Sequence, residues 1–161
     1  MKSLILVLNL FCCTAFGQIL PVIKEKPVID KNPVSNQEWL EFVKFIKNDA
    51  AFTQDYVQSM LPDNWTLTNL NTKANSQSVE GVNWHQAGEF CKWRSVVATY
   101  QYTHSGKASY SQMLNKNKIA NKVLICRLPT ENEFNEFAAK TSNTKKQDTG
   151  FRCVLETKRN I

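Results

Sequence analysis

Three helix-start signals divide this chain, and they restrict its fold more than any other feature. In each, a Ser, Asn or Thr that can cap a helix stands three residues before a Glu or Gln that can bond back to it. The pairs are Ser35 and Glu38, Asn83 and Gln86, and Thr130 and Glu133. Apolar residues follow each pair at helical spacing. The sequence therefore predicts three capped helices, and Tyr56 to Leu61 predicts a short fourth one that Pro62 ends.

Each capped helix carries an apolar stripe that we expect to face the core. The stripes are Trp39, Phe42, Val43 and Ile46 in the first, Ala87, Phe90, Cys91, Arg94 and Val97 in the second, and Phe134, Phe137 and Ala138 in the third.

Between the helices the chain offers only short strands. Residues 27–30 predict an edge strand, and residues 123–128 and 151–155 predict two more. Polar stretches at 64–78 and 101–121 predict loops. A chain of 161 residues suffices for one domain and is too short for two. These patterns favour an α+β domain with much irregular structure over residues 27–157, followed by a tail at 158–161.

The first residues have the pattern of an export signal. Lys2 supplies a positive start, an apolar run follows from Leu4 to Phe11, and Ala15 and Gly17 are the small residues that a signal peptidase reads. We therefore predict a signal peptide over 1–17 and an N-terminal segment over 18–26. A buried N-terminal helix and a lipid anchor on Cys12 or Cys13 are the alternatives. We expect a location in the periplasm or the outer envelope of a bacterium.

The remaining composition limits the function classes. The net charge of +6 comes from scattered lysines, with no nucleic-acid motif beside them. No apolar run reaches the roughly 18 residues of a membrane span. In an oxidising compartment Cys91, Cys126 and Cys153 predict one disulfide and one remaining thiol, and the spacing alone does not decide the pairing. We expect neither a nucleic-acid partner nor a transmembrane span.

Four short motifs, in order, resemble those of the formylglycine-generating-enzyme (sulfatase-modifying-factor) family. They run Pro33 to Val43, Val79 to Trp93, Arg127 to Phe134 and Gly150 to Cys153. The residues that carry the likeness, which we expect to be structural, are Ser35, Asn36, Trp84, Trp93, Arg127, Leu128, Pro129, Thr130, Glu131, Gly150, Phe151 and Arg152. Within the family, the chain is most similar to the gliding-motility and type IX secretion lipoproteins.

The resemblance implies a variant of the C-type-lectin-like fold, shortened before its last strand. It also implies a disulfide between Cys91 and Cys153, because these residues match the two cysteines of a family disulfide. Cys126 is then the free thiol, and we expect it to be a small buried residue.

The resemblance also implies that a catalytic segment is missing. Active family members carry a close pair of cysteines that bind Cu(I), in a long segment before the closing strand. Here only about ten residues join Lys140 to Gly150, too few for more than a short connection. We expect no close cysteine pair after the signal, no catalytic residue, no metal and no cofactor.

Other chemistries find little support. His85 and His104 are the only histidines, and His104 lies in a predicted loop, so an iron site with two histidines and a carboxylate is not indicated. Glu131, Glu133 and Glu136 share one short helix and are typical of capping and solvated residues.

We therefore expect an exported, non-catalytic envelope module. It would bind an unknown protein or an envelope glycan through the loops at 62–80 and 101–121. A copper-dependent formylglycine-generating oxidase and a decayed or truncated family member are the alternatives.

The mature protein is expected to begin near Gln18, because small residues occupy the two positions read by the peptidase. The intact mass of the exported protein measures this directly. A mass that retains Met1, or that includes a lipid on Cys12 or Cys13, would contradict the assignment.

Overall fold

The computed structural model describes residues 26–70, 74–120, 122–141 and 150–159. The predicted signal peptide and nearly all of segment 18–26 lie outside these ranges. The described residues form an α+β fold. Its elements are β1 (Val28–Ile29), α1 (Asn36–Asn48), α2 (Gln54–Ser59), α3 (Trp84–Thr103), α4 (Tyr110–Lys118), β2 (Lys122–Arg127), α5 (Glu131–Thr141) and β3 (Val154–Arg159).

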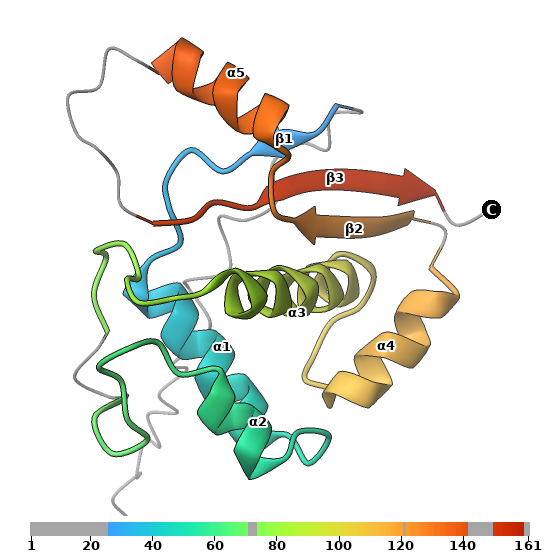
Figure 1. Ribbon diagram of the computed structural model, residues 1–161. Coiled ribbons are helices and arrows are strands. Elements are labelled where there is room, and N and C mark those ends of the chain that lie inside the picture. Colours follow the sequence, from blue (N-terminus) through green and yellow to red (C-terminus); the bar gives the residue numbers. More distant parts are fainter. Residues whose placement is uncertain (1–25, 71–73, 121, 142–149, 160–161) are drawn as a thin grey trace, which may run out of the picture.

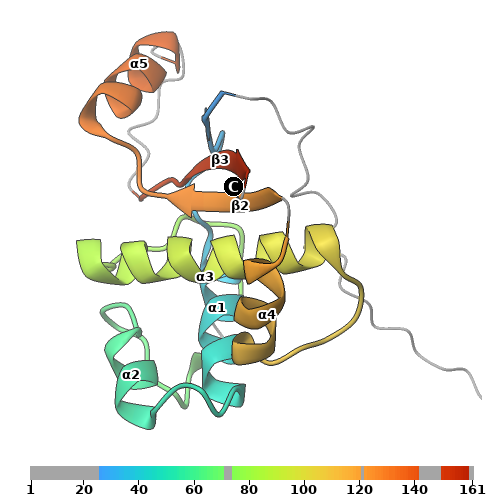
Figure 2. The same ribbon diagram turned by 90° about the vertical axis from the view of Figure 1, so that its right-hand side faces the viewer.

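The three strands form one antiparallel sheet in the order β1-β3-β2. Figures 1 and 2 show α3 running directly along the sheet beside β2. Helices α1, α2 and α4 lie on the far side of α3, and α5 lies beyond the sheet at β1. The sheet and α3 are therefore the centre of the molecule.

The capping pairs begin the helices where the sequence predicts. The Ser35 hydroxyl accepts the Glu38 N–H at 3.2 Å, and the Glu38 carboxylate accepts the Ser35 N–H at 2.8 Å. The corresponding bonds of Asn83 and Gln86 measure 2.9 and 2.8 Å. Thr130 and Glu133 make the same exchange before α5.

Helix α4 contradicts the predicted loop at 101–121. Ser109 and Gln112 form a further capping box at its start, so the same signal was present in the sequence. The helix was missed because its surface is polar and Met113 is its only buried residue.

Strand β3 begins later and ends later than the predicted strand at 151–155. Its register with β2 runs from Arg127 opposite Val154 to Lys122 opposite Arg159, so part of the predicted tail belongs to the sheet. Residues Phe151 and Cys153 instead bond to the chain before α1. Val34 N–H donates to the Phe151 carbonyl, and Asp30 N–H donates to the Cys153 carbonyl, both at 2.9 Å.

An aromatic cluster forms the core between α1, α3 and the segment before β3. Trp39 stacks on Phe90 with ring centroids 5.3 Å apart, and Phe42 packs against Phe90 and Trp93 at 5.7 and 5.3 Å. Phe151 meets Trp39 edge-on at 5.8 Å. The apolar stripes predicted for the first two capped helices are buried, as the sequence predicts.

The stripe predicted for the third helix is wrong. In α5, Phe134 is 47% exposed and Ala138 is exposed as well. Only Phe137 is partly covered, and the Arg152 guanidinium lies 5.1 Å from its ring centre. The helix is tied to the sheet by polar contacts instead, with Arg127 bonding both oxygens of Glu133 at 2.7 and 2.8 Å.

Two hydroxyl groups of α3 cover the outer edge of β2. Thr99 accepts the Leu124 N–H at 2.8 Å and donates to the Leu124 carbonyl at 3.1 Å. Ser95 accepts the Cys126 N–H at 2.7 Å and lies 2.9 Å from the Cys126 carbonyl. A sheet edge with free backbone groups is a template for pairing with another chain. Here the helix occupies those groups at two alternate positions of the strand.

Replacing Thr99 with Val is expected to lower the free energy of unfolding by about 2–4 kcal/mol. The substitution keeps the shape but leaves the N–H and carbonyl of Leu124 buried without a partner, and each lost partner costs about 1–3 kcal/mol. Urea denaturation measures the difference. Thr103→Val in the same helix is the matched control, because Thr103 is exposed and bonds back to α3 carbonyls. Equal losses in the two variants would show that the hydroxyl of Thr99 does not stabilise the edge.

Candidate functional site

Three sulfur atoms meet beneath the sheet. Cys91 comes from α3, Cys126 from β2, and Cys153 directly precedes β3. Their Sγ atoms all lie within 4.8 Å of one another, and the residues are 1%, 3% and 0% exposed. Cys91 and Cys153 form a disulfide, the pairing that the family resemblance implied, and Cys126 is free and buried.

This sulfur cluster corrects one expectation from the sequence. No close cysteine pair was expected after the signal, because the three residues lie far apart along the chain. The sheet register and the packing of α3 on β2 bring them together in space. Spacing along the sequence could not show this, because the contacts join three separate elements.

A buried ion pair adjoins the sulfur cluster. The Arg94 guanidinium bonds both carboxylate oxygens of Asp30, the second at 3.1 Å, and the Arg94 side chain is 9% exposed. Asp30 also accepts the Cys153 N–H at 3.3 Å. Sequence reasoning placed Arg94 on the buried stripe but missed this partner, 64 residues earlier in the chain. A buried arginine requires an acidic partner, and that requirement was the available signal.

The environment keeps the Cys126 thiol protonated. Burial raises its pKa to about 12, although the neighbouring Arg94 cation acts in the opposite direction. The thiolate is the nucleophilic form of cysteine, so burial disfavours the reactive form of this thiol. The other two sulfurs are bonded to each other, so Cys126 carries the one free thiol of the three.

The residues of the family motifs are distributed through the fold and not gathered at one site. Ser35 and Thr130 cap α1 and α5, Asn36 begins α1, and Trp93 is buried in the aromatic cluster. Leu128 and Pro129 are half-buried between β2 and α5, whereas Glu131 is exposed.

Two motif residues, Gly150 and Arg127, occupy positions where the structure requires a particular residue. Gly150 has a φ of +139°, and a Cβ there would lie 3.1 Å from the Cβ of Ser78 and 3.2 Å from that of Pro33. Arg127 binds Glu133 and reaches Glu156 at 3.4 Å. The hydrogen bonds from Arg127 and from the Thr130 backbone lower the pKa of Glu133 to about 2.

Trp84 is the most exposed aromatic residue of the motifs. It is 73% exposed at the first position of α3. The two histidines also lie apart from the sulfur cluster. His85 is exposed, and His104 stacks on Tyr100 with ring centres 5.1 Å apart. Within the described ranges, no group of three metal-ligating side chains includes a histidine.

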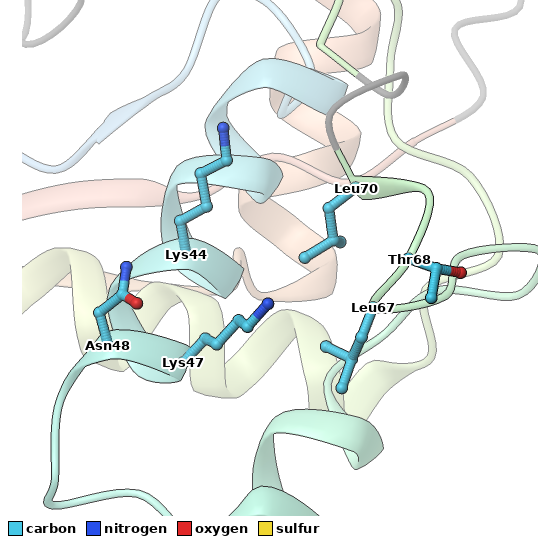
Figure 3. A pocket seen from close by; sticks show the side chains of 6 residues that line it. All are labelled: Lys44, Lys47, Asn48, Leu67, Thr68 and Leu70. Atoms are coloured by element: carbon cyan, nitrogen blue, oxygen red, sulfur yellow. The ribbon is translucent and has the colours of Figure 1, made fainter.

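A pocket of about 230 Å³ lies between α1 and the loop that follows α2. Its walls are Lys44, Lys47 and Asn48 from the helix and Leu67, Thr68 and Leu70 from the loop. Figure 3 shows Lys47 extending toward the two leucines. The pocket thus combines two cationic side chains with an apolar wall, in one of the loops that the sequence indicated for binding.

None of the described helices is long and apolar enough to cross a membrane.

Comparison with known proteins identifies one family. The sequence model of the sulfatase-modifying factor enzyme 1-like domain matches residues 25–147. No curated protein and no solved structure matches the chain significantly. The family match does not distinguish among branches of the family, so the likeness to gliding-motility lipoproteins stays an expectation. Because the match covers well over half of the 161 residues, the chain belongs to the family of the sulfatase-modifying factor enzyme 1-like domain.

Proposed function

We propose that the chain is an exported, non-catalytic member of this family that binds a partner in the bacterial cell envelope. The observation that carries the proposal is the state of its sulfur atoms. The oxidases of the family hold Cu(I) with a close pair of cysteines, and the described cysteines here are buried, with two of them bonded to each other.

The burial of the sulfur cluster argues against turnover. An oxidase of this kind must bring Cu(I), oxygen and a cysteine of the substrate to one open position. The three cysteines are at most 3% exposed. One described pocket lies between α1 and the loop at 67–70, and another lies beside α5. None of the three cysteines lines either pocket. A substrate peptide therefore has no described path to them.

The extent of the core argues against a decayed domain. Trp39, Phe42, Val43, Ile46 and Cys153 are all fully buried, and the cluster around them includes residues from α1, α2, α3, α4 and β2. Packing of this kind is expected to give a cooperative unfolding transition.

The pocket between α1 and the loop at 67–70 supports the binding role. Lys44 and Lys47 offer positive charge, and Leu67 and Leu70 offer apolar contact. Charges around an apolar recess select a partner of opposite sign and raise its rate of association. We therefore propose that the partner is an acidic segment of another envelope protein that also carries an apolar side chain.

The protein is expected not to convert a cysteine peptide to formylglycine. The test incubates the full chain with Cu(I), reductant, oxygen and a peptide containing Cys-x-Pro-x-Arg, and mass spectrometry detects the aldehyde. A family oxidase that retains its cysteine pair is the positive control. Turnover above a metal-free sample, lost in Cys126→Ser, would overturn the non-catalytic assignment in favour of the copper-dependent oxidase.

A photo-crosslinking residue at Thr68 is expected to capture a protein partner in the native cells, because Thr68 is exposed at the pocket. The same residue at exposed Lys158, on β3, is the matched control. Replacing both Lys44 and Lys47 with Glu should abolish the adduct at Thr68. Three results would contradict an acidic protein partner. The two positions could give identical adducts, the adduct at Thr68 could survive the lysine changes, or the adduct could be a glycan that resists protease.

A further inference from the structure

The sulfur cluster has an arrangement that the proposed binding function does not use. Cys91, Cys126 and Cys153 come from three separate elements, and a single disulfide needs only two of them. All three Sγ atoms lie within 4.8 Å of one another. Once the disulfide is reduced, a third sulfur at this distance brings three soft ligands together.

Each of the three cysteines is positioned by hydrogen bonds that do not involve the disulfide. Ser95 accepts the Cys126 N–H at 2.7 Å and lies 2.9 Å from the Cys91 carbonyl. Asp30 exchanges hydrogen bonds with both backbone groups of Cys153, at 2.9 and 3.3 Å. Opening the disulfide therefore leaves the backbone supports of all three sulfurs in place.

We propose that, once the Cys91–Cys153 bridge is reduced, the three cysteines bind one Cu(I) ion. A dithiol reductant supplies two electrons and two protons to the bridge and becomes a disulfide itself. Three thiols are then present, and they release protons as the metal binds. The inference concerns a different state of the protein from the proposed function, because it requires the reduced bridge.

The distances suit a three-coordinate metal. Metal–thiolate bonds of about 2.3 Å, the length found for zinc, space three sulfurs in a trigonal site by about 4 Å. Reduction moves the two bonded sulfurs apart toward that spacing, and Cys126 already lies within 4.8 Å of both. Zn²⁺ would need a fourth ligand; no fourth ligating side chain joins the group among the described residues, and the burial of all three cysteines disfavours a water in that position. Soft sulfur donors without a fourth ligand favour Cu(I) over Zn²⁺.

Thiolates in a buried site need positive charge nearby. Burial and the Asp30 carboxylate raise the pKa of Cys126, and the Arg94 guanidinium acts in the opposite direction. Arg94 is itself paired with Asp30, so most of the required charge comes from the metal. A coordinating thiol loses its proton to the metal. The protonated resting state of Cys126 is therefore compatible with binding.

The test uses the full chain with Cys12 and Cys13 replaced by Ser, so that only the cluster offers thiol ligands. The protein is reduced without oxygen, and Cu(I) is titrated against a chromogenic Cu(I) chelator. One equivalent is expected to bind, with an affinity at least tenfold higher than in Cys126→Ser, which keeps the two bridge cysteines. X-ray absorption should count three sulfur neighbours in the parent protein and two in the variant.

Several outcomes would overturn the proposal. Equal affinities in the parent and Cys126→Ser would show that the third sulfur is not a ligand. Equal binding by the oxidised protein would place the metal elsewhere. If reduction abolishes the near-UV circular dichroism of the tryptophans, adding Cu(I) should restore it, and failure to do so also counts against the site. Aldehyde formation in the assay above is a separate result, because a buried metal can bind without turning over a substrate.

Discussion

The contact between α3 and β2 is the interaction on which the rest of the structure depends. Thr99 and Ser95 stand one turn apart on the helix, and each bonds a residue of the strand through both its N–H and its carbonyl. Backbone groups buried without partners would cost more than most side-chain contacts contribute. Two hydroxyl groups thus join the helical layer to the sheet, and the same contact places Cys91 of α3 near Cys126 of β2.

The ion pair between Asp30 and Arg94 extends this attachment from α3 to the residue that follows β1. It joins the segment after β1 to α3, and the carboxylate also holds the backbone of Cys153. A buried pair of this kind is weak evidence for stability, because desolvation opposes the attraction of the charges. Its effect on geometry is direct, since it aligns the segment after β1, α3 and the chain before β3 around the disulfide. The family match supplies the general kind of domain, and these contacts show how this chain assembles it.

The sequence predicted the parts of the fold that depend on local signals. The capping boxes at Ser35, Asn83 and Thr130 located three helix starts, because the bonds that they form lie within four residues. The box at Ser109 was overlooked, because no apolar stripe followed it. The exposure of Phe134 could not be predicted, since it depends on which element packs against α5 and not on helical spacing. The sulfur cluster was hidden for the same reason, and so was the pairing of Arg94 with Asp30.

The order of the strands has a consequence for how the chain assembles as it is made. β3 comes last among the described strands and is the middle strand of the sheet, so β1 and β2 lack their partner until residues 154–159 have been synthesised. Pairings between distant parts of a chain form slowly, because the intervening loop must first close. During that interval α3 and β2 are already complete, and Cys91 and Cys126 are present together before Cys153. A disulfide between Cys91 and Cys126 can therefore form before the native one. Once Cys153 is present, Cys91 can form the native disulfide with it.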